Sequence, residues 1–189
     1  MQKLTDSLDF LSDNALMLKV KGGDLDKMGL LFQRYHLPLY GFLFHMTKQR
    51  EASEDIVQNV FFRMLKYRHA FTGGEFKTWM YHVARNVLND HFKKTLRSGV
   101  HYPVEVVEEK IAGGVLTDVA IEKKQELKTL ERALDGLSAE NRELLILSRW
   151  QELKYSEIAL ILDISEGAVK VRVHRALQLL RANYLKMNG

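Results

Sequence analysis

The fold is decided by the stretch that runs from residue 155 to residue 170, Tyr155-Ser156-Glu157-Ile158-Ala159-Leu160-Ile161-Leu162-Asp163-Ile164-Ser165-Glu166-Gly167-Ala168-Val169-Lys170. Its apolar residues have the spacing of two helices joined by a tight turn, with Ile158 and Leu162 on the inner face of the first helix and Ile164 filling the turn. Ser165 is a suitable N-cap for the second helix, which is expected to extend to about Lys186. The stretch therefore predicts a helix-turn-helix.

The second helix of this pair is strongly cationic, because no acidic residue follows Glu166. Val169 and Val173 would pack inward and leave the basic residues facing outward around the first two turns. In a helix-turn-helix, this part of the second helix enters the major groove, where arginine can bind guanine and lysine can hold a phosphate. The candidate contacts are Ser165, Gly167, Lys170, Arg172, His174 and Arg175. A packing unit with a solvated, charged face is the structural alternative.

The composition limits the classes of protein that need be considered. With 46% hydrophobic and 28% charged residues, the chain is expected to form a globular protein. It has no cysteine, which excludes a disulfide framework and thiolate metal sites. No apolar run approaches the roughly 18 residues of a membrane span, and the first residues do not resemble a signal peptide. We therefore expect a cytoplasmic protein without direct membrane insertion.

Helical periodicity dominates the rest of the chain and predicts an all-α protein with two small helical domains joined by a flexible linker. Pro38 is expected to break or kink the first long helix, and Ser53 to cap the next one. Glycine, proline and acidic residues replace the periodic pattern after Lys94, and net basic blocks lie on both sides of this acidic segment. The predicted boundaries are 1–94 for the first domain, 95–118 for the linker and 119–189 for the second domain.

Three segments resemble the sigma-70 family of RNA polymerase sigma factors. Residues 154–177 resemble region 4, which in the family binds the −35 element, although Ala168 and Val171 stand where the family usually has Thr and Ser. Residues 54–61 resemble the polymerase-docking helix of region 2, and residues 76–91 resemble the helix of regions 2.3 and 2.4. The chain has no room for region 3, which identifies the small extracytoplasmic-function (ECF) group.

The resemblance implies that the protein is a polymerase subunit rather than an enzyme, with core RNA polymerase and promoter DNA as partners and an anti-sigma factor as a further one. No cofactor, metal or small-molecule substrate is expected. The implied polymerase contacts, made with the coiled coil of the largest subunit, are Glu54, Asp55, Gln58, Asn59 and Arg63. Asn59 occupies a position where the family commonly has an acidic residue.

The same resemblance implies that the first domain melts and binds the −10 element. Holding an opened strand requires cations for the phosphates and aromatic surfaces for unstacked bases. The implied residues are Lys66, Arg68, Phe71, Phe76, Lys77, Trp79, Arg85, Asn86 and Lys93. Several of these aromatic side chains are also candidates for the core, Trp79 in particular, and Asn86 is as well suited to bonding a backbone group as to binding a base.

Other functions fit the sequence less well. Gly73-Gly74-Glu75-Phe76 resembles part of the signature loop of diguanylate cyclases, but that domain needs a further acid, a mixed sheet and a longer chain. The histidines lack ligand spacing, and there is no P-loop or serine nucleophile elbow. A conventional helix-turn-helix regulator, which binds duplex DNA without being a polymerase subunit, is the main alternative. An interaction protein that has lost promoter binding is another.

Overall fold

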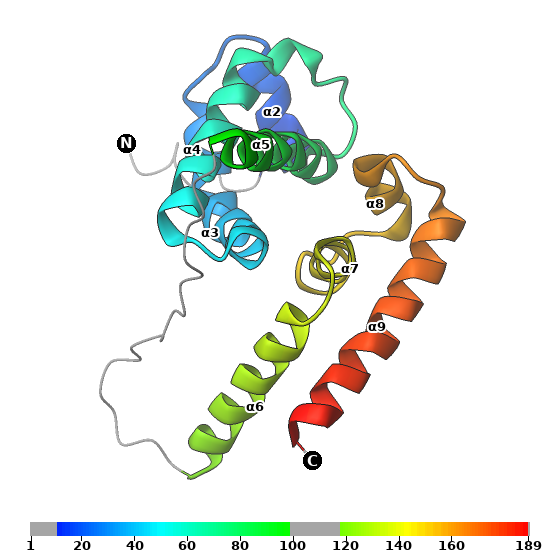
Figure 1. The fold of residues 1–189 in the computed structure, drawn as a ribbon. Coiled ribbons are helices and arrows are strands. Elements are labelled where there is room, and N and C mark those ends of the chain that lie inside the picture. Colours follow the sequence, from blue (N-terminus) through cyan, green and yellow to red (C-terminus); the bar gives the residue numbers. More distant parts are fainter. Residues whose placement is uncertain (1–10, 99–117, 189) are drawn as a thin grey trace. The chain divides into compact units, whose positions relative to one another are not determined.

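The computed structural model describes residues 11–98 and 118–188, and every regular element in these residues is helical, which confirms the all-α prediction (Figure 1). The elements in chain order are α2 (Asp13–Lys21), α3 (Lys27–Thr47), α4 (Arg50–Lys66), η1 (Arg68–Ala70), α5 (Phe76–Ser98), α6 (Asp118–Asp135), α7 (Ala139–Leu145), η2 (Ile146–Trp150), α8 (Tyr155–Leu162) and α9 (Glu166–Asn188). Helices α2 to α5 belong to one compact unit. The second unit contains α6, α7, η2, the start of α8, and α9.

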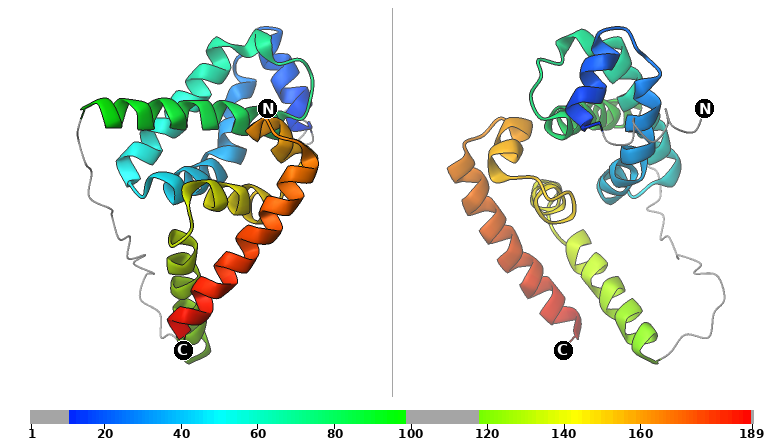
Figure 2. Two further views of the ribbon diagram at one scale, coloured as in Figure 1. Left: turned by 45° about the vertical axis from the view of Figure 1, so that its right-hand side comes forward. Right: turned by 180° about the vertical axis from the view of Figure 1, so that it is seen from behind.

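In the first unit, α4 packs against both α3 and α5, and α2 packs against α3, α5 and η1 (Figures 1 and 2). The core is made by the apolar stripes that the sequence shows at helical spacing. Phe42 of α3 and Tyr81 of α5 meet edge to face with their ring centroids 5.4 Å apart, and both are fully buried. The burial of these large side chains supplies most of the favourable free energy that holds the helices together.

A polar cluster fixes the start of α2 on α3. One carboxylate oxygen of Asp13 accepts a hydrogen bond from Arg34 at 2.7 Å, and the other accepts one from the hydroxyl of Tyr35. Arg34 also donates to the carbonyl of Leu11 at 2.9 Å. Burial, and then the hydrogen bond to Asp13, raise the pKa of Tyr35, so its phenol stays neutral and remains a donor. This cluster fixes the position of α2 relative to α3.

The predicted cap at Ser53 is wrong, and of the two outcomes predicted for Pro38, a break or a kink, the break does not occur. Ser53 does not cap α4, because the helix begins at Arg50 and Ser53 is buried inside it, bonding the carbonyl of Gln49 at 2.6 Å and the hydroxyl of Thr47 at 2.8 Å. Pro38 does not break α3, which continues to Thr47. Buried residues on both sides of the proline, including Leu31 and Leu43, hold the helix together despite the missing backbone donor.

In the second unit, α6 and α9 lie side by side and run in opposite directions, and α7 also packs on α9 (Figures 1 and 2). Ser138 caps α7, accepting a hydrogen bond from the backbone of Asn141 at 3.4 Å. The helical backbone continues from α7 to Trp150 as η2, which has π-helical geometry. Asn183 of α9 donates to the carbonyl of Ala133 at 3.2 Å, which links the last part of α9 to α6.

The guanidinium of Arg142 holds the turn between α6 and α7. It donates to the carbonyls of Leu134 at 3.3 Å, Asp135 at 2.7 Å and Leu137 at 3.2 Å. These carbonyls lie at or just beyond the C-terminal end of α6, where backbone acceptors have no partner within the helix. One side chain from α7 therefore completes the end of the preceding helix.

Glu152, the second residue after the end of η2, has a strained backbone. Glu152 has φ +54° and its side chain is exposed. We expect Glu152→Gly to raise the free energy of unfolding of the second unit by about 0.5–1 kcal/mol, because glycine avoids the steric cost of roughly 1–2 kcal/mol that a Cβ has in the left-handed region. Urea denaturation followed by circular dichroism measures the change. Glu152→Ala is the control, since it keeps the Cβ; an equal gain from alanine would contradict the explanation.

The boundaries of the helices differ in detail from the predicted ones. Helix α5 continues to Ser98, beyond the predicted end at Lys94, and α6 begins at Asp118. Most of the predicted linker, residues 99–117, lies outside the described residues, as do residues 1–10. None of the helices in residues 11–98 and 118–188 combines the length and the apolar character that crossing a membrane requires.

Candidate nucleic-acid interface

Helices α8 and α9 form the predicted helix-turn-helix. The backbone N–H of Lys154 donates to the carboxylate of Glu157 at 2.6 Å, which satisfies a donor at the start of α8. The turn contains Asp163 at φ +55°, and Ile164 donates to the carbonyl of Ala159 at 3.1 Å. The hydroxyl of Ser165 then accepts from the backbone N–H of Ala168 at 3.2 Å, which confirms Ser165 as the N-cap of α9.

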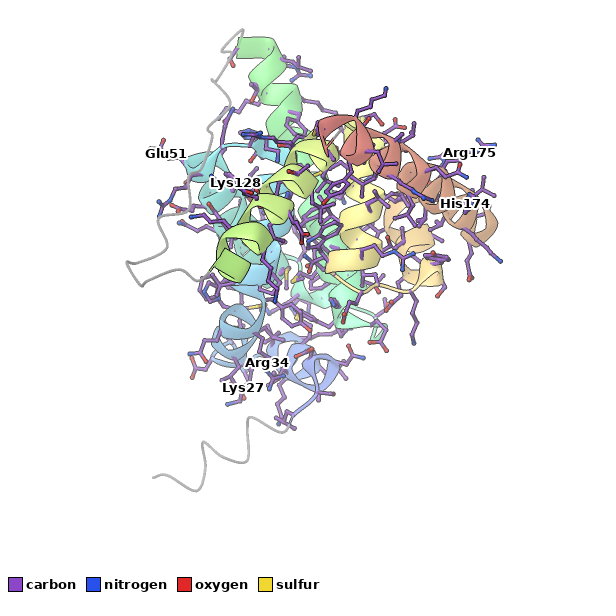
Figure 3. All side chains as sticks on the ribbon, turned by 90° about the horizontal axis from the view of Figure 1, so that it is seen from below. Lys27, Arg34, Glu51, Lys128, His174 and Arg175 are labelled. Atoms are coloured by element: carbon purple, nitrogen blue, oxygen red, sulfur yellow. The ribbon has the colours of Figure 1, made fainter. Side chains whose placement is uncertain are left out.

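The first two turns of α9 present a basic face. Val169 and Val173 are buried, so the side chains between them point outward. Figure 3 shows His174 and Arg175 projecting from the helix. All six residues predicted to contact the −35 element are exposed, namely Ser165, Gly167, Lys170, Arg172, His174 and Arg175. The structure therefore brings the predicted side chains onto one accessible part of α9, with donors suited to base edges and phosphates.

The two departures from the usual region 4 pattern lie on the same part of α9. Val171 is 50% exposed between Lys170 and Arg172, whereas Ala168 is half-buried. Neither side chain can donate a hydrogen bond to a phosphate. The exposed methyl groups of Val171 are instead suited to apolar contact with the methyl group of thymine.

Helix α4 has one buried and one polar face. Its buried face contains Ile56, Val60 and Phe61, while the predicted polymerase contacts Glu54, Asp55, Gln58 and Asn59 are exposed. Arg50 pairs with Glu54 at 3.1 Å, an exposed contact of little energetic weight. The exposed carboxylates of Glu54 and Asp55 make the N-terminal half of this polar face acidic.

Arg63 lies in a different environment from the other predicted polymerase contacts. It is half-buried, donates to the side-chain oxygen of Asn59 at 3.3 Å and pairs with Asp90 of α5 at 2.9 Å. Arg63 thus connects α4 to α5 within the first unit. Sequence reasoning missed this role because nothing in the local pattern indicates that Asp90 lies opposite.

Two of the predicted −10 residues, Asn86 and Lys93, belong to an exposed polar stripe on α5. His82, Asn86, Asn89 and Lys93 follow one another at helical spacing, and all four are exposed. The side-chain amide of Asn86 lies 3.5 Å from Nδ1 of His82. Among the other predicted residues, Lys77 and Arg85 are half-buried.

Two basic residues lie before the loop that leads into α5. Lys66 is exposed, and its ammonium lies 5.3 Å from the centre of the Tyr67 ring. Arg68 is half-buried and donates to the carbonyl of Leu65 at 3.1 Å.

The structure corrects the interpretation of two aromatic residues. Phe71 and Phe76, both predicted to face an unstacked base, are 1% and 0% exposed and belong to the core. The Phe76 ring lies 5.3 Å from that of Tyr35, and the Phe71 ring lies 5.3 Å from that of the half-buried Trp79. In this conformation neither phenylalanine is accessible to DNA. Their position in a loop and at a helix start, where no periodicity separates inside from outside, explains the error.

These buried rings bracket an exposed loop, residues 72–75, that connects η1 to α5. Gly73 has φ +90°, which glycine adopts without strain. The backbone N–H of Phe76 donates to the side-chain oxygen of Asn14 at 2.6 Å, and the ammonium of Lys21 donates to the carbonyl of Phe71 at 2.6 Å. Sequence reasoning missed both α2 residues, since the bonds span 62 and 50 positions and no local signal announces them.

Comparison with protein-family models places two matches on the chain. The model for Sigma-70 region 2 matches residues 31–98, and the model for Sigma-70, region 4 matches residues 127–180. The first match contains α4 and α5, and the second contains the helix-turn-helix.

Curated relatives extend over most of the chain. The ECF RNA polymerase sigma factor SigX of Bacillus subtilis (strain 168) is 33% identical over 156 residues, which are 80% of this chain and 80% of that protein. The ECF RNA polymerase sigma factor SigM of the same organism is 30% identical over 158 residues, covering 82% of this chain and 93% of SigM.

Two solved structures have a similar fold. CnrH, in complex with the cytosolic domain of CnrY, has a TM-score of 0.69 at 20% identity and covers 94% of this chain and 99% of CnrH. The sigma factor RpoE, in complex with the anti-sigma factor NepR from Bartonella quintana, has a TM-score of 0.65 at 25% identity, covering 84% of this chain and 98% of RpoE.

Proposed function

This chain belongs to the ECF sigma factors of the sigma-70 family, and from that membership we propose which of its surfaces bind the polymerase and which bind promoter DNA. As a sigma factor it binds core RNA polymerase and directs promoter-specific initiation of transcription. It makes and breaks no covalent bond in this role, and it acts in the cytoplasm, where the polymerase meets DNA. Residues 1–94 and 119–189 act as its two functional domains.

The exposed polar face of α4 docks on the polymerase. Glu54, Asp55, Gln58 and Asn59 are accessible and share this helix, whose opposite face is buried in the first unit. Arg63 contributes indirectly, because its pair with Asp90 holds α4 against α5. Docking through a charged, exposed helix face favours fast and oriented association.

The loop 72–75 and the polar stripe of α5 hold the opened −10 strand. Asn86 and Lys93 face solvent on α5, with Lys66 and Arg68 before the loop and Lys77 and Arg85 within the helix. Trp79 remains partly accessible beside Phe71, so it can contribute an aromatic edge. Cations for phosphates together with an exposed loop for an unstacked base match the requirements for capturing a single strand. Phe71 and Phe76 support the loop from the core.

The N-terminal part of α9 enters the major groove at the −35 element. The support is the helix-turn-helix geometry, the cap at Ser165 and the exposure of Lys170, Arg172, His174 and Arg175. Arg172 and Arg175 have the fork geometry that binds guanine, and Lys170 supplies a phosphate contact.

An anti-sigma factor controls the protein. The related sigma factor RpoE is bound to the anti-sigma factor NepR in its solved structure, and it matches 84% of this chain at 25% identity.

The main support for the proposal is that one chain contains both a region 2 match and a helix-turn-helix, because a conventional regulator does not need region 2. The test is to add the purified protein to bacterial core RNA polymerase and to carry out run-off transcription on genomic fragments. Stoichiometric core binding with new, discrete start sites is expected. Binding to duplex DNA by the protein alone, without core binding, would favour the conventional regulator instead.

A further inference from the structure

The loop 72–75 is held at both ends by one helix, α2, which is distant from it in sequence. At the first end, Lys21 bonds the carbonyl of Phe71 at 2.6 Å. At the second end, Asn14 bonds the backbone N–H of Phe76 at 2.6 Å, across 62 positions. Asn14 and Lys21 are separated by two helical turns and therefore lie on nearly the same face of α2. A single helix face thus supplies both bonds.

Each bond has a clear physical effect. The first N–H groups of a helix lack partners within it, so Asn14 acts as an N-terminal cap of α5 supplied by a distant part of the chain. Lys21 is half-buried and its bond to a carbonyl is charge-assisted, which makes it stronger than a neutral one. Since Phe71 and Phe76 are also fixed by ring packing, the four exposed residues between them begin and end at fixed points.

Helix α2 is itself well anchored. Asp13, the neighbour of Asn14, receives hydrogen bonds from Arg34 and Tyr35 of α3, and Arg34 also bonds the carbonyl of Leu11. Leu16, Met17 and Val20 of the same helix are completely buried. Because α2 is fixed by the core of the first unit and bonds both ends of the loop, the core determines where the loop lies.

We propose that Asn14 and Lys21 are positioning residues for capture of the −10 strand: they do not contact DNA but hold the loop 72–75 in the conformation that receives an unstacked base. This inference rests on the proposed role of the loop. A loop that is ordered before binding loses less conformational entropy when the strand enters, so the bonds act on the affinity for the opened strand rather than on docking to the polymerase.

The test uses holoenzyme assembled from core polymerase and the full chain. The probe is a fluorescent single-stranded oligonucleotide with the −10 sequence of a promoter mapped by run-off transcription. We expect Asn14→Ala and Lys21→Met each to weaken probe binding by about fivefold, the equivalent of one capping hydrogen bond, with unchanged affinity for core polymerase. Asn14→Asp retains the acceptor, and Lys21→Arg retains a charged donor; both are expected to restore most of the binding.

Lys19→Met is the matched control for Lys21→Met, because Lys19 is exposed on the same helix and the charge change is identical. If Lys19→Met and Lys21→Met weaken probe binding equally, a general charge effect explains the loss and the inference is overturned. If Asn14→Ala also loses core affinity through unfolding, Lys21→Met, which leaves the cap intact, decides the question.

A loop variant separates this inference from the function on which it rests. Thr72→Ala combined with Glu75→Ala changes exposed side chains of the loop alone. If this variant and both α2 variants leave probe binding unchanged, the loop does not capture the strand and the proposed function of the loop fails. If the loop variant weakens binding but Asn14→Ala and Lys21→Met do not, the loop functions without its anchors and only the inference about α2 is wrong.

Discussion

Replacing Arg172 by alanine is expected to reduce transcription from −35-dependent promoters by roughly 5- to 150-fold, the equivalent of about 1–3 kcal/mol for a bidentate contact to a guanine. Arg172 is exposed in the second turn of α9, and the buried Val169 and Val173 fix the direction in which it points. The loss should be greatest for promoters with the preferred −35 base, so selectivity should relax along with activity. Run-off transcription on a promoter and on −35 variants of it measures both effects.

The comparison variants separate base recognition from charge. Arg172→Lys keeps the charge but not the planar fork, so it should retain general DNA affinity while losing selectivity at one base pair. Arg181→Ala is the matched control, since Arg181 is exposed on the same helix further from its N-terminus. Normal transcription by Arg172→Ala at every cognate promoter would show that the assignment of α9 to the groove is wrong.

Reversing two charges on α4, as Glu54→Lys with Asp55→Lys, should weaken binding to core polymerase by at least about 30-fold. Like charges brought together in an interface cost several kcal/mol, and the natural carboxylates contribute to steering as well. Both residues are exposed and remote from the buried face of α4, so the variant should fold normally. Fluorescence anisotropy of labelled protein titrated with core polymerase measures the affinity.

A control with the same change in net charge is available in the same unit. Asp24→Lys with Asp26→Lys alters two exposed acidic residues between α2 and α3, where the contact of Asp24 with Lys27 is long at 3.7 Å. This control should bind core polymerase normally. Intact core affinity in the Glu54/Asp55 variant would remove the docking role from this face of α4.

Local features of the structure were predictable because local physics determines them. The N-caps at Ser138 and Ser165 follow from a hydroxyl next to a helical pattern, and the outward position of Arg172 follows from the spacing of Val169 and Val173. The same reasoning failed at Ser53, where a hydroxyl that looks like a cap instead bonds Gln49 and Thr47 inside the helix.

The features that escaped prediction depend on contacts between distant parts of the chain. Nothing near Phe76 indicates that Asn14 caps its helix, and nothing near Arg63 indicates that Asp90 faces it. The aromatic residues on either side of the loop suit both a core and a base-stacking surface, and only tertiary packing assigns Phe71 and Phe76 to the core. Sequence pattern therefore identified the residues around the loop proposed to bind the −10 element, but it could not separate those that support the loop from those that are accessible to DNA.

The Arg142 guanidinium makes the turn between α6 and α7 cooperative. The carbonyls of Leu134, Asp135 and Leu137 all accept from the guanidinium of Arg142, so movement of this one side chain breaks the three hydrogen bonds together. When Arg142 moves away, all three carbonyls lose the guanidinium at once, while Leu134 still accepts from the backbone N–H of Leu137 at 3.1 Å. The two helices consequently tend to open and close together, as one local folding unit rather than two.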